Sequence, residues 1–358
     1  MTLVYTVGQE TQMAFGIAVI GLDHWYTAFG VLDIAAGSER VTLAGVADPD
    51  RDRLAGIAET TAGISAVTDY RELLRREDVD LVAICAPTDQ APEIAQAALR
   101  AGKHVLSVKP PARTLAELDA VLAVSAETGR FYGSFEGMQR VHPKAQTLRR
   151  LLAEGAIGQP ITYHQVGHGG LPSPWRGEPS GGDSWWLRAA QVPGGAWLDH
   201  AIYAVDLARY AFGGEVDLRT ISGLTDRRVH SSLAVEDYGA ALMRLTPTGA
   251  TDGVALAPVT LFIEDTWVAD AVKGGGAHRL EILGTAGTLR FDPATNAWIV
   301  TKGSATPVSH PVSASPFFIL DALPEVTEQH LRGEATPFGA ADARANLEIC
   351  LRFYAAAR

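Results

Sequence analysis

Gly21 and Asp48 stand at the ends of two apolar runs, where their side-chain types could serve a bound nucleotide. In the stretch AVIGLDHWYTAFG (18–30), Gly21 ends the first run and a helix-like segment follows. A glycine there lets a phosphate approach the helix N-terminus, and a carboxylate 27 residues later can accept hydrogen bonds from a ribose. Asp23 and Tyr26 replace the later glycines of the usual fingerprint, and Asp23 would repel a pyrophosphate unless it turned away or capped the helix. The pattern alone fits either a dinucleotide site or an ordinary core strand.

Such a site needs a parallel sheet behind it, and the first third of the chain has the pattern of one. Apolar runs predict strands over 15–22, 41–50, 80–87, 103–110 and 131–137, with helix-like segments between them. Continuous apolar strands joined by helices indicate a parallel sheet covered on both faces. Its ligand crevice is expected at the C-terminal ends of the strands.

From about residue 138 the pattern changes to strands separated by turn signals. The segments ITYHQVGH, LRTISGLT, YGAALMRLT, VTLFIEDT, HRLEILGTAGTLRFD and AWIVTKG predict a mostly antiparallel sheet. We therefore predict an α/β fold, with a doubly wound nucleotide-binding domain over 1–137 and an α+β domain with a largely antiparallel open sheet over 138–335. A C-terminal helix over 336–358 is expected to pack back on the first domain.

Composition excludes several classes of partner. The 358 residues have a formal net charge of −11 and no Lys/Arg-rich run, which argues against nucleic acid or an anionic membrane as a partner. No apolar run approaches the roughly 20 residues of a membrane span, and the N-terminus lacks the pattern of a signal peptide. Cys85 and Cys350 lie in apolar surroundings, as buried thiols of a reducing compartment do. We expect a cytoplasmic protein.

Several separated motifs resemble the Gfo/Idh/MocA oxidoreductases, and they span most of the chain. AGKHV stands at 101–105, and Lys109-Pro110 matches that family's Lys-Pro pair. The remaining matches are G-x-I-G at 155–158, PGGAWLDHAIYAVDLARYAFGG at 193–214, LEILGTAGTLRFD at 280–292 and the C-terminal ARANLEICLRFYAAAR. The resemblance implies a Rossmann domain, a substrate domain whose open sheet face is a common dimer surface, and a homodimer or homotetramer.

The resemblance also implies the site residues. It makes Lys109, Asp199 and Tyr203 catalytic, with Tyr203 in place of the usual helix histidine, as in the glucose–fructose oxidoreductase and dihydrodiol dehydrogenase branches. The expected cofactor-binding residues are Gly21, Asp23, His24, Asp48, Ala86, Pro87, Lys109, Pro110 and Gln139. The expected substrate-binding residues are Glu136, Arg140, Trp186, Arg188 and His200. Asp206 could share the helix face of Tyr203.

The implied reaction is hydride transfer between nicotinamide and a secondary alcohol or ketone of a sugar, inositol or related polyol. A lysine ammonium near Tyr203 would favour the phenolate and polarise the substrate oxygen, so the pair could transfer a proton. Asp199 lies four residues before Tyr203 and shares its side of the helix. The alternative interpretation of Tyr203 is an ordinary, half-buried helix tyrosine.

The sequence leaves two alternatives open, one for the cofactor and one for the class of protein. Asp48 favours NAD because it would repel a 2′-phosphate, while Arg51 and Arg53 leave NADP open. A non-catalytic, regulatory relative that has lost its cofactor is the second hypothesis, supported by the missing glycines and by Val108 before Lys109. The Trp-rich segment 174–197 could bind a polyol or cover a contact. His164, His168 and Asp183 lack the spacing of a metal site, and none is expected.

Overall fold

The computed structural model describes residues 15–61, 63–248, 250–251, 254–271, 276–313 and 318–357. The N-terminal segment, for which we expect no signal peptide, lies outside these residues. In the described part of the chain, no helix combines the length and apolar character that crossing a membrane requires.

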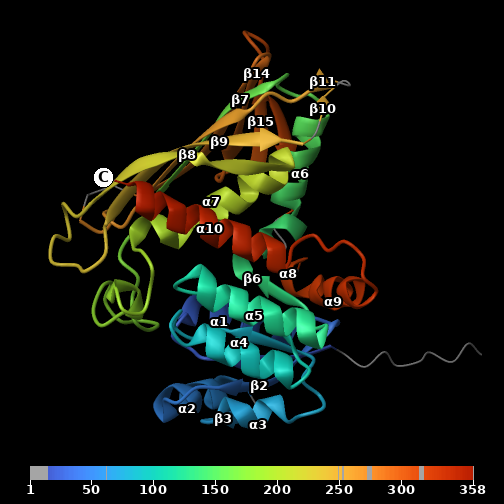
Figure 1. Ribbon diagram of the computed structural model, residues 1–358, viewed down its shortest axis with the longest axis vertical. Coiled ribbons are helices and arrows are strands. Elements are labelled where there is room, and N and C mark those ends of the chain that lie inside the picture. The colour runs from blue at the N-terminus through green and yellow to red at the C-terminus, as the bar shows by residue number, and fades with distance from the viewer. Residues whose placement is uncertain are drawn as a thin grey trace, which may run out of the picture.

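A six-stranded, fully parallel sheet forms the lower half of the molecule in Figure 1. Its strand order is β3-β2-β1-β4-β5-β6, and helices cover both faces. The strands are β1 (Phe15–Ile20), β2 (Val41–Ala47), β3 (Ala66–Val67), β4 (Leu81–Ile84), β5 (His104–Ser107) and β6 (Tyr132–Ser134), and the helices are α1 (Trp25–Gly37), α2 (Arg51–Thr60), α3 (Tyr70–Leu74), α4 (Ala91–Arg100) and α5 (Leu115–Thr128). The predicted doubly wound domain is confirmed. The sequence missed β3 and α3 because two and five residues are too few to show a period.

Local sequence signals set where these helices begin and end. The Asp50 carboxylate accepts hydrogen bonds from the backbone N–H groups of Asp52 and Arg53, which starts α2 directly after β2. Thr114 caps α5 in the same way through Glu117, and Gly129 ends that helix in the left-handed region at φ 65°. These caps place the start of α2 directly after β2 and the start of α5 after β5.

The upper half is an eight-stranded sheet with the order β16-β15-β14-β13-β7-β12-β9-β8. Its strands pair antiparallel except for β7 with β12, so the mostly antiparallel prediction is confirmed. The strands are β7 (Pro160–His168), β8 (Gly214–Asp226), β9 (Tyr238–Pro247), β12 (Val259–Thr266), β13 (Ala277–Gly284), β14 (Gly287–Asp292), β15 (Ala297–Thr301) and β16 (Val308–Pro311), and β10 (Ala250–Thr251) pairs with β11 (Val254–Ala255). The helices α6 (Pro143–Ala153) and α7 (Ala196–Phe212) cover one face and share its core.

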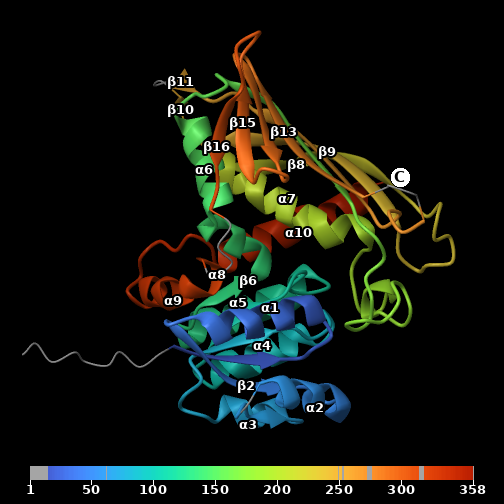
Figure 2. The same cartoon turned by 180° about the vertical axis from the view of Figure 1, so that it is seen from behind.

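The C-terminal segment joins the two halves. Along α10 (Ala340–Ala356), Ala343 and Leu347 pack in the core of the parallel sheet, whereas Cys350 and Phe353 pack in the core of the second sheet. Figure 2 shows α8 (Phe318–Asp321) and α9 (Leu323–Leu331) beside the lower half of the molecule. Leu323 packs in the core there, so the structure places this segment with the first domain rather than inside the 138–335 unit expected from sequence. No change in composition marks that return of the chain.

Candidate active site

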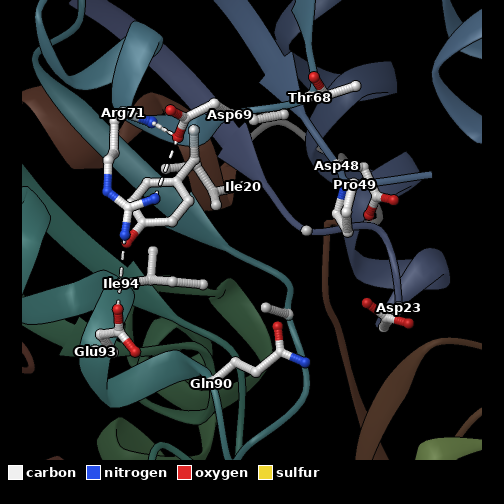
Figure 3. A pocket seen from close by; sticks show the side chains of 14 residues that line it. Ile20, Asp23, Asp48, Pro49, Thr68, Asp69, Arg71, Gln90, Glu93 and Ile94 are labelled. Carbon is white, nitrogen blue, oxygen red and sulfur yellow. Dashed lines mark hydrogen bonds and ion pairs between the residues drawn. The ribbon is translucent and has the colours of Figure 1, made fainter. Parts of the chain in front are cut away.

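A cavity of about 410 Å³ lies at the C-terminal ends of β1, β2 and β4 (Figure 3). Four of the residues expected to bind the cofactor line it: Gly21, Asp23, Asp48 and Ala86. Gly21 has φ +83°, and a Cβ there would lie 2.5 Å from the backbone nitrogen of Ala86. Only glycine therefore fits between these two strand ends. The cavity matches the nucleotide crevice of a doubly wound sheet.

The carboxylate of Asp23 is paired. Its Oδ1 lies 3.1 Å from Nη1 of Arg53, and the Arg53 guanidinium stacks on the Trp175 ring at 4.7 Å. The Trp185 indole N–H also donates to the Asp23 carbonyl at 3.2 Å. The arginine offsets the repulsion that the sequence predicts between Asp23 and a pyrophosphate. Two tryptophans from the second domain thus reach the nucleotide loop.

Asp48 is held by the backbone around it. Its two carboxylate oxygens accept hydrogen bonds from the N–H groups of Leu22 at 2.7 Å and Asp50 at 2.9 Å. Burial raises the pKa of Asp48. Across the cavity, Figure 3 shows Arg71 between Asp69 and Glu93, 3.4 and 3.7 Å away. The lining therefore has an excess of carboxylates around a single guanidinium that is already paired.

The other residues expected to bind the cofactor lie elsewhere along the strand ends. His24 is buried at the start of α1, with Nε2 3.0 Å from the Tyr26 hydroxyl and Nδ1 without a hydrogen-bond partner. Pro87 accepts the first backbone hydrogen bond of the turn into α4, and Pro110 accepts one from the Thr88 hydroxyl. Gln139 donates to the Tyr203 carbonyl at 2.8 Å and belongs to a second cavity.

Lys109 and Asp199 join the two domains. The Lys109 ammonium follows β5, is 2% exposed, and forms an ion pair with the Asp199 carboxylate near the start of α7. It also donates to the Asp199 carbonyl at 2.6 Å. The second carboxylate oxygen accepts from the Trp267 indole N–H at 3.0 Å. Despite burial, His200 and Lys109 lower the pKa of Asp199, so it stays ionised.

Aromatic rings surround this ion pair. The Lys109 ammonium lies 4.6 Å from the Trp186 ring centroid and 5.4 Å from the Tyr203 ring centroid. The lysine of the first domain and the tyrosine of the second therefore converge, as the sequence interpretation requires. Trp186 is buried, stacks on Trp185 at 4.7 Å, and faces the ammonium rather than an open cavity.

Tyr203 is not set up as a phenolate. Burial raises its pKa, and the nearby carboxylates of Glu136 and Asp199 raise it further. Asp199 holds the Lys109 ammonium, which faces the ring of Tyr203. The expectation that Lys109 favours the phenolate is therefore wrong for this geometry. Tyr203 keeps its proton at neutral pH and can donate it.

His200 is paired with a carboxylate that the sequence analysis did not single out. Its Nδ1 lies 3.2 Å from Oδ1 of Asp265, at the end of β12, and its Nε2 lies 3.8 Å from Asp199. Although burial lowers the pKa of His200, Asp199 and Asp265 outweigh it, and the net shift is upward. A Cβ on Gly167 would lie 2.5 Å from the Asp265 carboxylate, so a glycine there leaves room for it.

A cavity of about 300 Å³ opens beside these residues. Its lining includes Tyr203, His200 and Asp265 together with neutral amides and further basic side chains. Tyr203 lines this cavity and also lies beside the Lys109 ammonium, so it connects the two. A hydroxyl-bearing ligand of one sugar ring would meet several hydrogen-bonding groups there.

Glu136 and Arg140 lie outside both cavities, in a buried polar network. Arg140 forms an ion pair with Asp206 at 2.6 Å, and Asn346 of α10 donates to Asp206 at 2.9 Å. Glu136 accepts from the Ser134 hydroxyl and, at 3.4 Å, from Asn346. Glu136 and Arg140, which the sequence predicts to bind substrate, therefore connect α7 and α10 at the domain boundary, together with Asp206.

The buried carboxyl of Glu136 gives stability a pH dependence. Burial raises its pKa to about 7 from 4.5, so the folded chain binds more protons than the unfolded chain between these values. The contribution of Glu136 to the free energy of unfolding is therefore fully present below pH 4.5. It is lost as the pH rises through about 7, and the loss is at most about 3 kcal/mol. Thermal unfolding of Glu136→Gln should show a flatter profile over this window. An unchanged profile would contradict the assignment.

Arg188 and the histidines of β7 have partners outside the cavity of Tyr203. Arg188 is half-exposed and pairs with Asp183 at 2.5 Å, so the structure does not bring it to the other site residues. His168 pairs with Glu264 at 2.9 Å, and His164 packs on Phe262. Among the described residues, no group of three His, Cys, Asp or Glu side chains is arranged to hold a metal ion.

Sequence reasoning missed three groups that position the site. Asp265 orients His200, Trp267 binds Asp199, and Glu236 accepts the N–H groups of Gly195 and Trp197 at the start of α7. Acidic residues next to predicted strand ends were the available signal. The partners of the three groups are 39 to 68 residues distant, so spacing could not pair them.

Two family descriptions match this chain. Residues 15–135 match an oxidoreductase family with an NAD-binding Rossmann fold, and residues 145–290 match the GFO/IDH/MocA C-terminal domain. The chain belongs to the Gfo/Idh/MocA family. The two matches lie on the two sheets and leave the bridging helix α10 outside.

Two of the relatives are named inositol dehydrogenases. Inositol 2-dehydrogenase 2 of Saccharopolyspora erythraea is 29% identical over 78% of this chain and 72% of its own length. Myo-inositol 2-dehydrogenase of Thermotoga maritima is 29% identical over 49% of this chain, which spans about half (48%) of that protein.

Solved structures share the fold across the whole chain. Aldose-aldose oxidoreductase from Caulobacter crescentus, complexed with glycerol, has a TM-score of 0.77 and 23% identity over 96% of this chain and 98% of its own. Levoglucosan dehydrogenase, in complex with NADH and L-sorbose, has a TM-score of 0.74 and 18% identity over 96% and 97%. At these identities the likeness concerns the fold.

Proposed function

We propose that this chain is an NAD-dependent oxidoreductase that transfers a hydride between nicotinamide and a secondary alcohol or ketone of a sugar or polyol. The observation that supports it is the buried Lys109–Asp199 pair, which joins the ends of the Rossmann strands to the helix that presents Tyr203. Bound nicotinamide would supply the hydride acceptor or donor. The residues Gly21, Asp23, Asp48 and Ala86 would hold the dinucleotide in the cavity that they line.

Lys109, Asp199 and Trp186 each have a separate role in the proposal. The Lys109 ammonium polarises the substrate oxygen and offsets negative charge that develops on it. Asp199 keeps that ammonium in place through its carboxylate and its carbonyl. Trp186 closes the other side of the ammonium and excludes water from it.

Proton transfer uses Tyr203 and His200 in series, and the same route runs in both directions. When a ketone is reduced, the Tyr203 hydroxyl donates its proton to the oxygen that gains charge, and the imidazolium of His200 returns a proton to the Tyr203 oxygen. When an alcohol is oxidised, the Tyr203 oxygen takes the substrate proton while its own proton passes to His200, whose imidazole changes charge closer to neutral pH than a phenol does. Asp265 orients the imidazole and stabilises its charged form.

Cofactor choice can be measured directly. We expect NAD⁺ to bind at least about tenfold more tightly than NADP⁺, because Asp48, Asp69 and Glu93 would repel a 2′-phosphate. Calorimetric titration with each cofactor gives the ratio of the two dissociation constants, and Asp48→Asn should bring the two constants closer together. Binding of neither cofactor at millimolar concentration would remove the proposal and favour the non-catalytic alternative. A panel of polyols, read by nicotinamide absorbance, then identifies the substrate.

The assembly of the chain is a further part of the proposal. Leu224, Leu242, Phe262 and Leu283 are each 41–47% exposed, and they lie on four strands of the second sheet. The register places Phe262 opposite Leu242, so apolar side chains gather on the face that none of the described helices covers. We propose that two copies pair through this face as a homodimer. A cytoplasmic location stays a prediction, and Cys85 and Cys350 are buried free thiols.

A further inference from the structure

We propose that the substrate carries an anionic group, a carboxylate or a phosphate ester, and that Lys144 binds it with help from His278 and Arg279. The inference rests on the proposed function, because it concerns the cavity beside Tyr203. These three basic residues and His200 line that space. The one acidic residue in its lining is Asp265, whose carboxylate is already bonded to His200.

The ammonium of Lys144 is the group that we expect to bind the anion. It lies in the first turn of α6, where its carbonyl accepts the Trp298 indole N–H at 2.9 Å, so its backbone is fixed. Its ammonium lies 3.9 Å from the Phe291 ring centroid, and within the described ranges no ion pair joins it to a carboxylate. Burial lowers the pKa of Lys144. A ring face attracts an ammonium but is a poor hydrogen-bond acceptor. The three N–H donors of Lys144 could instead form hydrogen bonds with an anion.

The neighbours of Lys144 are also basic. The His278 ring lies 6.4 Å from the His200 ring, and burial lowers the pKa of His278, with further lowering by His200, Lys144 and His168. The lowered pKa leaves His278 neutral at neutral pH, where its ring can donate one N–H to an anion, while the Lys144 ammonium and the Arg279 guanidinium give the space its positive potential. An anionic substrate would be drawn into this cavity.

The rest of the lining fits a polyol attached to the anion. Gln139 and Gln165 supply neutral amides, and Tyr203 and His200 stand where a reacting hydroxyl would lie. The volume of about 300 Å³ is at the small end for ligand cavities, which favours a single sugar unit with one charged substituent. Uronic acids, aldonic acids and sugar phosphates have this chemistry.

The test compares each acid with its neutral parent. The carboxylate arm uses D-gluconate against D-glucitol, and the phosphate arm uses D-glucose 6-phosphate against D-glucose. For each probe we would measure calorimetric binding to the NAD⁺-loaded protein and kcat/KM where turnover occurs. We expect one acid to bind at least about tenfold more tightly than its parent, with an advantage that falls as salt rises.

Lys144→Met keeps the aliphatic packing on Phe291 and removes the charge. It should reduce the preference for the acid about 10- to 100-fold, mainly through KM, whereas Lys302→Met, an exposed lysine outside the cavity lining, should not. The inference fails if neutral parents bind as well as the acids, or if Lys144→Met weakens both alike. If the inference fails but the protein still turns over a neutral polyol with NAD, the proposed function stands. If the parent protein does not bind NAD, the proposed function itself fails.

Discussion

Lys109→Met is expected to lower kcat by about a thousandfold or more while NAD affinity changes only a few-fold. Among the described residues, the Lys109 ammonium alone both pairs with Asp199 and faces the rings of Trp186 and Tyr203, so we expect no neighbour to replace it at the reacting oxygen. Steady-state kinetics and calorimetric titration of NAD⁺ separate the two effects. Full activity in this variant would contradict the role of Lys109.

A matched double variant separates chemistry from folding. Removing Lys109 alone leaves the Asp199 carboxylate buried without its cation, which costs about 3–5 kcal/mol of stability. Lys109→Met combined with Asp199→Asn removes both charges, and we expect its thermal unfolding to return close to that of the parent protein. Turnover should stay absent. Recovery of turnover together with stability would show that the pair has a structural role only.

Tyr203→Phe is expected to lower the rate of ketone reduction by about a hundredfold or more, with little loss of stability. Burial and two nearby carboxylates keep the phenol protonated, so the proton it donates is lost in the variant. In the described part of the chain the hydroxyl makes no hydrogen bond, and its removal breaks none. Stopped-flow reduction at saturating cofactor measures the effect.

His200→Asn provides the matched comparison in the opposite direction. Oxidation should slow as the pH falls through the raised pKa of His200, because the protonated imidazole cannot accept a proton. The groups that face it are Asp199 and Asp265, which raise the pKa, and Lys109 and His278, which are basic. The asparagine variant should lose this acid limb of the pH profile. A limb that persists in His200→Asn would assign the proton acceptor to another group.

Much of the scaffold could be predicted from local sequence pattern. Continuous apolar runs such as 80–87 predict strands that are buried on both faces, because such strands have no polar positions. The helices between these runs, with their period of 3.6 residues, then indicate a parallel sheet. The Lys-Pro pair and the four-residue spacing of Asp199 and Tyr203 placed three residues that the structure brings together. The short elements β3 and α3 gave no such pattern.

The protonation and the partners of these groups were decided by tertiary structure alone. Arg53 neutralises Asp23, Asp265 orients His200, and the Asp199 that holds Lys109 also helps keep Tyr203 protonated. Glu136 and Arg140, which look like cleft residues in sequence, are instead tied to the C-terminal helix through Asn346 and Asp206. Burial and charge act through space between groups far apart in the chain. Sequence therefore determined which reactive side chains stand at which strand and helix ends, and only packing decided which of them are charged, paired and able to react.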